Sequence, residues 1–277
     1  MSCVQFTMSI RRENQSLIKT YDQLVFEVKA EGTSVHVRLP GREGTAMTET
    51  TKKPQEQNPM KITVSRDGPY IVTGRVPLIA EEICNDDEGY CRTWREAKRY
   101  PVQDQYALCR CGQSQNKPFC DGSHVKVSFN GTEAAGGEPY LRHPRVIRGP
   151  ELELLDHEHL CVHARFCMRA GGIWNLTKQS GIPKARDTVV EEACNCPSGR
   201  LVIRDQETGK AIEPELEKSI VLIEYPARGE HGPLWVRGGI PVISADGKPY
   251  TVRNRLTLCR CGKSHNKPFC DGSHVQH

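Results

Sequence analysis

The chain has 277 residues and a formal net charge of +4, with 37% hydrophobic, 26% charged and 6% aromatic residues. This length accommodates roughly two or three small domains, and the 24 glycines and 18 prolines favour short strands and turns over long helices. Lysine and arginine are scattered without accompanying aromatic residues, so no nucleic-acid partner is expected. No apolar run approaches the roughly 20 residues of a membrane span, so no membrane anchor is expected.

Cysteine is abundant, with 13 residues in the chain. The N-terminal sequence MSCVQFTMSIRRENQS lacks the apolar stretch of a signal peptide, so we expect the protein in the cytoplasm. In that reducing compartment, tight clusters of cysteine with histidine are better interpreted as metal ligands than as disulfides. Cys84 and Cys91, in the acidic stretch CNDDEGYC, are interpreted instead as free surface thiols.

Residues 1–58 are predicted to form an N-terminal extension and linker. Residues 24–39 alternate apolar and polar side chains around Glu31-Gly32, which is typical of a β-hairpin. Residues 41–59 are polar and rich in proline, threonine and glutamine, which predicts a flexible linker. We assign no chemistry to this extension.

An internal repeat dominates the remainder of the chain. The sequence LCRCGQSQNKPFCDGSHV at residues 108–125 returns as LCRCGKSHNKPFCDGSHV at residues 258–275, with substitutions at only two positions. Upstream of both copies, at residues 67–78 and 231–242, apolar residues alternate after a Gly-Pro turn. A whole module is therefore duplicated.

The repeat predicts one module at residues 59–132 and a second at residues 225–277. The first module differs from the second by a charged insertion around residues 84–100. It also continues beyond the repeated motif into a strand predicted at residues 125–129.

Both copies share the spacing C-x-C-x8-C-x3-H, in which three cysteines and one histidine can reach a common metal centre. The candidate ligands are Cys109, Cys111, Cys120 and His124 in the first copy and Cys259, Cys261, Cys270 and His274 in the second. The Cys-Asp-Gly-Ser-His run is predicted to open a helix, with Asp121 and Ser123 as cap residues. Three thiolates and one imidazole also suit tetrahedral zinc, so a zinc knuckle is the alternative.

The segment between the modules, at residues 140–224, is predicted to be a third small domain with a helix near residues 187–193 and a strand at 219–225. It contains four cysteines of its own, within HLCVHARFC and EACNCPSGRL. These candidate ligands are Cys161, Cys167, Cys194 and Cys196.

At every defined position, both repeats resemble the CDGSH iron-sulfur domain of the NEET proteins, C-x-C-x2-S-x3-P-x-C-D-G-S-H. The resemblance implies one redox-active [2Fe-2S] cluster per motif and hence two in the chain. It also implies that Cys109 and Cys111 bind one iron while Cys120 and His124 bind the other, with the same division in the second copy. Family members with one motif form homodimers, which implies intramolecular pairing of the two modules here.

The middle cysteines resemble a second family. The arrangement C-x-H-x3-C followed by C-P-S-G is similar to the divergent single-cluster ferredoxin domain. This resemblance implies that Cys161, Cys167 and Cys196 are ligands and that Cys194 or His163 supplies a fourth. The standard ferredoxin spacing is absent, so a third iron-sulfur cluster, a zinc ion and an unligated thiol set remain alternatives.

Together these patterns predict a β-rich α+β protein in which two small CDGSH modules flank a small ferredoxin-like α+β segment. We expect an iron-sulfur protein that acts in electron transfer or cluster transfer with a redox or cluster-acceptor protein. The alternatives are an electron-transfer component of an oxidoreductase complex and a zinc-stabilised interaction module. The chain has no nucleotide-binding glycine loop, nucleophile elbow or paired-carboxylate site, so it is not expected to be an enzyme by itself.

The histidine ligand leads to two further expectations. Histidine must be unprotonated to bind iron, so mildly acid pH should release the clusters. His274 is followed by only three residues, so we expect the second cluster to be held less firmly than the first.

Overall fold

The computed structural model describes residues 58–135, 140–141 and 143–276, together with four strands within residues 11–38. The chain divides into two compact units, Met1–Gln57 and Asn58–His277. No helix in the described part of the chain is both long and apolar enough to cross a membrane.

The first unit contains one antiparallel sheet with its strands in chain order. These strands are β1 (Arg11–Glu13), β2 (Ser16–Tyr21), β3 (Leu24–Glu31) and β4 (Ser34–Arg38). The antiparallel pairing of β3 with β4 agrees with the hairpin predicted at residues 24–39. Residues 41–57 of the predicted linker lie outside the described residues.

The second unit contains both repeated modules. The first module supplies β5 (Lys61–Val64), β6 (Tyr70–Thr73), β7 (Leu78–Asn85), β8 (Cys91–Arg99) and β9 (Gln105–Leu108). The second supplies β14 (Ser219–Tyr225), β15 (Glu230–Arg237), β16 (Val242–Ile243) and β17 (Arg255–Leu258), with the 3-10 helix η3 (Pro226–Arg228) after β14. The strand predicted at residues 219–225 is β14, which pairs with β15 in the sheet of the second module, although the predicted boundary placed residues 219–224 in the middle segment.

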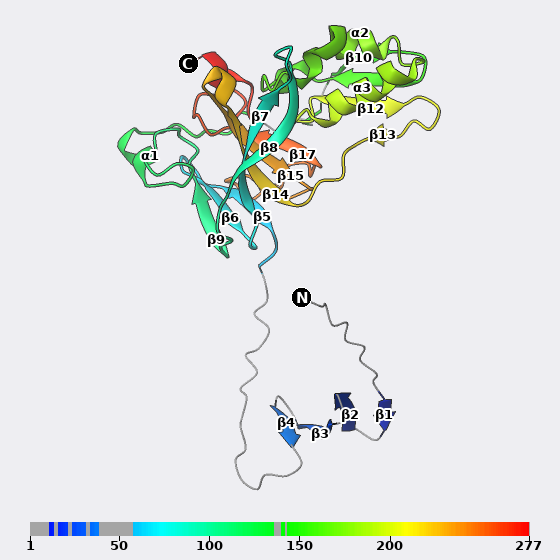
Figure 1. The fold of residues 1–277 in the computed structure, drawn as a ribbon. Helices are drawn as coiled ribbons and strands as arrows, with labels where there is room; N and C mark the ends of the chain where they lie inside the picture. Colours follow the sequence, from blue (N-terminus) through cyan, green and yellow to red (C-terminus); the bar gives the residue numbers. More distant parts are fainter. Residues whose placement is uncertain are drawn as a thin grey trace. The chain divides into compact units, whose positions relative to one another are not determined.

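The two modules exchange a strand. β5, β6 and β9 form an antiparallel set, and β14, β15 and β17 form its counterpart. β7 of the first module pairs in parallel with β14, while β16 of the second module pairs in parallel with β5. The resulting sheets have the orders β16-β5-β6-β9 and β17-β15-β14-β7-β8, so each contains strands of both modules (Figure 1).

One hydrophobic core lies between these sheets. It draws on apolar side chains of both modules that are at most 2% exposed, including Ile62, Val72, Leu108, Leu222, Val236 and Leu258. Separating the modules would return this apolar surface to water at about 25 cal/mol per Å². The modules are therefore stabilised as one folded body.

The charged insertion of the first module extends β7 and adds β8 at the edge of the larger sheet. Most of β8 is exposed, but the Trp94 ring lies 4.7 Å from the Phe166 ring and 5.1 Å from the Trp235 ring between centroids. The interpretation of Cys91 as a surface thiol is wrong, because Cys91 is 2% exposed and its Sγ lies 3.1 Å from the Tyr225 hydroxyl. Cys84 is a half-buried free thiol.

The middle segment folds around its own antiparallel sheet. The strands are β10 (Arg145–Arg148), β11 (Leu152–Asp156), β12 (Leu201–Asp205) and β13 (Ala211–Ile212). Between β11 and β12 lie η1 (Glu158–Leu160), η2 (Phe166–Gly171), α2 (Ile173–Thr177) and α3 (Pro183–Cys194). The helix predicted near residues 187–193 is confirmed within α3, whose Val189 and Ala193 are buried against this sheet.

Each repeated motif ends in a single helical turn, α1 (Ser123–Lys126) in the first copy and the 3-10 helix η4 (Ser273–Gln276) in the second. The strand predicted at residues 125–129 is therefore wrong. The Val127 amide donates to the Ser123 carbonyl at 3.1 Å and the Phe129 amide to the His124 carbonyl at 2.9 Å, so the backbone turns back on itself. With these elements in place, the β-rich α+β class is confirmed.

Candidate metal centres

The first motif is held as a closed loop by backbone hydrogen bonds. β9 ends at Leu108, and the Cys109 amide then donates to the Pro118 carbonyl at 2.8 Å. The Cys120 amide returns to the Ala107 carbonyl at 2.9 Å. The second motif repeats this pattern, with Cys259 to Pro268 at 2.8 Å and Cys270 to Thr257 at 3.0 Å.

The four predicted ligands of each motif meet in two pairs. Sγ of Cys109 lies 3.8 Å from Sγ of Cys111, and Sγ of Cys120 lies 3.4 Å from Nδ1 of His124. The second motif has 3.6 Å between Cys259 and Cys261 and 3.5 Å between Cys270 and His274. Two thiolates on one tetrahedral metal at about 2.3 Å lie about 3.8 Å apart, and a thiolate and an imidazole about 3.5 Å apart. Each pair is therefore spaced to share one metal ion.

The pairs do not merge into one larger group. Among the described residues, no set of three or more His, Cys, Asp or Glu side chains converges on a single ion. A mononuclear zinc knuckle needs four ligands around one point. The arrangement is compatible with a centre that contains two metals, each held by one pair.

An aspartate orders the turn between the third cysteine and the histidine. The Asp121 carboxylate accepts the Gln115 amide at 2.8 Å and the Ser123 amide at 2.9 Å. Hydrogen bonds from Ser123 and Gln115 hold the pKa of Asp121 well below its usual range. The N-cap of α1 is Gly122, without a side-chain cap hydrogen bond, so the prediction of Asp121 and Ser123 as cap residues is not confirmed. Asp121 instead orders the turn from the position before the cap, and Asp271 does the same in the second motif with the amides of His265 and Ser273.

The two C-x-C loops meet through glycines. A methyl group on Gly112 would lie 2.5 Å from the Cys261 carbonyl oxygen, and one on Gly262 would lie 2.5 Å from the Cys111 carbonyl oxygen. Both glycines have positive φ, 76° and 80°. The loops of the two motifs therefore approach each other with backbone against backbone, which only glycine allows.

Tyr70 of the first module supports the loop of the second motif. Its hydroxyl shares its single hydrogen between the Cys259 carbonyl oxygen at 2.8 Å and the Pro268 carbonyl oxygen at 3.0 Å, and the side chain is fully buried. A cavity of about 600 Å³ lies between the modules and is lined by Cys109, Cys261 and His274, among other residues. Ligands of both motifs thus border one shared space.

The two motifs differ most in what covers the turn before the histidine. A methyl group on Gly122 would have no atom within 4 Å, whereas one on Gly272 would lie 2.7 Å from both the Cys161 carbonyl oxygen and Cδ2 of His163. Burial, followed by the nearby His163, lowers the pKa of His274 to about 4. The middle segment therefore covers the turn before His274, and this cover leads us to reverse the expectation that the second cluster is held less firmly than the first.

Three of the four middle cysteines lie together. Cys161 follows η1, Cys167 lies in η2 and Cys196 follows α3, and all three line a small cavity of about 30 Å³ with His163. Burial, together with the charges of Cys196 and Cys161, raises the pKa of the Cys167 thiol to about 12. His163 lines this cavity and Cys194 does not, and the His163 ring also lies against Gly272 of the second motif.

A buried ion pair borders this cavity. Arg200 lines it and donates to the Asp156 carboxylate from Nε at 2.6 Å and from Nη2 at 2.9 Å. Nε1 of Trp174 donates to the same carboxylate at 2.8 Å. The fully buried Asp156 is thus satisfied, and the arginine is fixed beside the cysteines.

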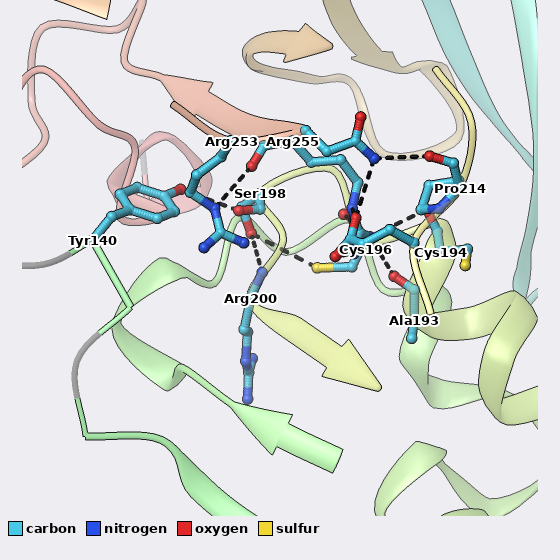
Figure 2. A network of polar contacts seen from close by, with 11 residues as sticks. Tyr140, Ala193, Cys194, Cys196, Ser198, Arg200, Pro214, Arg253 and Arg255 are labelled. Carbon is cyan, nitrogen blue, oxygen red and sulfur yellow. Dashed lines mark hydrogen bonds and ion pairs between the residues drawn. The ribbon is translucent and has the colours of Figure 1, made fainter. Parts of the chain in front are cut away.

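A second buried arginine joins the middle cysteines to the second module. Arg255, at the start of β17 and 1% exposed, donates to the carbonyls of Ala193 at 2.6 Å, Cys194 at 3.3 Å and Cys196 at 2.9 Å (Figure 2). Its remaining nitrogens donate to both carboxylate oxygens of Glu213 at 2.7 and 2.8 Å. Sequence reasoning missed this role.

Comparison with known proteins matches these sites to two families. Residues 67–125 and 231–275 match the family described as iron-binding zinc finger CDGSH type. Residues 147–206 match the family described as divergent 4Fe-4S mono-cluster. No curated protein and no solved structure matches the chain. The chain is therefore an iron-sulfur protein in which two CDGSH-type segments flank a divergent 4Fe-4S mono-cluster segment.

Proposed function

We propose that each CDGSH-type motif holds one [2Fe-2S] cluster through three cysteines and one histidine. One iron of each cluster would be held by the C-x-C pair, Cys109 and Cys111 or Cys259 and Cys261. The other would be held by a Cys-His pair, Cys120 and His124 or Cys270 and His274. The observation that carries this proposal is the pairwise spacing of the ligands, 3.4–3.8 Å within a pair.

In the middle segment, a 4Fe-4S type cluster is proposed, held by Cys161, Cys167 and Cys196 with His163 as the fourth ligand. The match to the divergent 4Fe-4S family and the shared cavity of these four residues support this set. Cys194 is left out of this set because it does not line the cavity that the other three cysteines share.

The chain as a whole is proposed to be an electron carrier for a redox protein partner in a reducing compartment such as the cytoplasm. When bound, the clusters supply one-electron chemistry, and the histidine ligand places the CDGSH potentials above the roughly −400 mV of plant-type ferredoxins. The protein contributes by burying the ligands of the second cluster. Cys259 and Cys270 are 1% and 2% exposed, so the second site favours retention of its cluster during reduction and reoxidation.

Iron and sulfide counting on anaerobically purified protein is the direct test. About eight irons per chain are expected with all three sites filled, and about four if only the CDGSH-type sites are filled. A colourless protein that contains zinc would refute the proposal. Matched variants assign the ligands: Cys196→Ser should lose the middle cluster, whereas Cys194→Ser should keep it.

A second candidate function, cluster donation, is favoured by one observation at the first site. Gly122 faces open space, and Cys120 and His124 are only half-buried. Incubation of the holo-protein with an apo-ferredoxin separates the two functions. Retained absorption with reversible reduction supports the carrier, and transfer of the absorption to the ferredoxin supports the donor.

A further inference from the structure

The three sites are not placed symmetrically within the second unit. The middle segment touches the second motif at Gly272, where the Cys161 carbonyl and the His163 ring occupy the space that a side chain would need. The equivalent Gly122 of the first motif has no such neighbour. Figure 1 shows α1, which follows Gly122, at the opposite end of the unit from α2 and α3 of the middle segment.

Two further contacts join the same pair of sites. Arg255 lies on the strand that leads into Cys259, and it donates to the carbonyl of Cys196 from the middle site at 2.9 Å. Tyr140 donates its hydroxyl to the Ser198 carbonyl at 3.1 Å, and its ring packs on Phe269 of the second motif at 4.6 Å between centroids.

The first motif reaches the second motif by another route. The C-x-C loops touch through Gly112 and Gly262, each of which lies against the carbonyl of a cysteine in the other loop. The second motif therefore contacts both other sites, on its C-x-C side and on its histidine side. Contacts between sites thus follow the order middle, second, first.

We infer that the three sites form an electron-transfer series with the second CDGSH-type site in the centre and the first as the terminal site that faces a partner. The inference rests on the proposed function and adds the order of the sites. In each step, one electron is lost by one site and gained by the next, and no bond of the chain forms or breaks. The first electron comes from a reduced one-electron carrier of the ferredoxin or flavoprotein class, and an oxidised carrier protein accepts it at the far end.

The order can be tested by electron paramagnetic resonance of the holo-protein after full reduction with dithionite. Clusters that neighbour each other broaden each other's signals, so the middle and first signals should each be broadened by the second. His274→Ala, which should empty the second site, is expected to sharpen both remaining signals. The matched variant His124→Ala, which should empty the first site, is expected to leave the broadening of the middle signal unchanged.

The glycines test the contact itself. Gly272→Ala should weaken the broadening between the middle and second signals, because the added methyl group would lie 2.7 Å from Cys161 and His163 and the two segments must move apart. Gly122→Ala imposes the same backbone strain, because φ is 85° at Gly122 and 87° at Gly272. Its methyl group would have no atom within 4 Å, so this variant should keep the broadening between the middle and second signals. Iron counting on every variant shows which clusters are present.

Three outcomes would overturn the series. The first is a fully loaded protein whose signals show no mutual broadening. The second is a middle signal that sharpens in His124→Ala but not in His274→Ala. The third is equal effects of Gly272→Ala and Gly122→Ala on the broadening. A wild-type protein without clusters would instead refute the proposed function, so the two failures are distinguishable.

Discussion

Replacing Arg255 with glutamine should destabilise the second unit and loosen the middle site. The guanidinium is 1% exposed and donates to three carbonyls, one of which belongs to Cys196. Two of its nitrogens, Nε and Nη2, also donate to the two carboxylate oxygens of Glu213. Glutamine removes the charge and cannot reach all of these acceptors, so carbonyls and a carboxylate lose their partner inside the fold.

The magnitude follows from the burial of the pair. Removing one partner of a buried ion pair costs about 3–5 kcal/mol. The Glu213 side chain is 28% exposed, so water can replace part of the lost interaction, and we expect the lower end of the range, about 3 kcal/mol. Arg255→Lys should fall between wild type and Arg255→Gln, because lysine keeps the charge but lacks the planar fork that bonds both carboxylate oxygens.

Urea unfolding of the holo-protein measures this loss. The control is Gln105→Ala, at the position of the first module that corresponds to Arg255, where the side chain is exposed and the expected change is within about 0.5 kcal/mol. A thiol reagent applied to metal-free protein should also react faster with Cys196 in Arg255→Gln. Equal urea midpoints for wild type and Arg255→Gln would show that the arginine does not join the middle segment to β17.

Three further predictions concern the sites. On acidification from pH 8 to 5, the first cluster should be lost before the second, because burial keeps the pKa of His274 at about 4 against about 6.5 for an ordinary histidine. The neutral His274 ring therefore contributes its full stability above about pH 6.5 and loses it as the pH falls towards 4. Visible absorption should then be acid-resistant in His124→Cys but not in His274→Cys, and the reverse result would contradict this order. Tyr70→Phe should cost about 1–2 kcal/mol in urea unfolding, because the buried Cys259 carbonyl loses its donor; no change would mean that water reaches this carbonyl. Cys194→Ser should retain the iron content of wild type, and a loss of about four irons would place Cys194 among the ligands.

Local patterns in the sequence predicted the parts of the structure that depend on nearby residues. The repeated spacing grouped the four candidate ligands of each motif, which lie within 16 residues of one another, and the family resemblance implied their division into pairs. The apolar run at residues 219–225 identified β14, which is buried along almost its whole length. Hydrophobic patterning failed at residues 125–129, where V-K-V-S-F alternates but the chain has already entered the turn of α1. Alternation depends only on the type of side chain, whereas backbone hydrogen bonds determine the conformation of that turn.

Features that join distant segments could not be predicted in this way. The parallel pairing of β7 with β14 places Ala80 opposite Leu222, and nothing in either strand indicates its partner. Arg255 stands in a short strand, where a charged residue usually indicates the solvent face, and its acceptors lie about 60 residues earlier in the chain. The cover over Gly272 depends likewise on a loop of another domain.

The two motifs share the same ligands but have different surroundings, because residues outside the motifs differ between the modules. Where the first module has Tyr70, the second has Leu234, so only the second motif's loop receives a tyrosine hydroxyl from the other module. Where the second module has the buried Arg255, the first has the exposed Gln105. A cluster potential depends on the hydrogen bonds and solvent exposure around its ligands as well as on the ligands. Two sites with the same four ligand types are therefore expected to differ in potential and in stability, which is the condition that an ordered series requires.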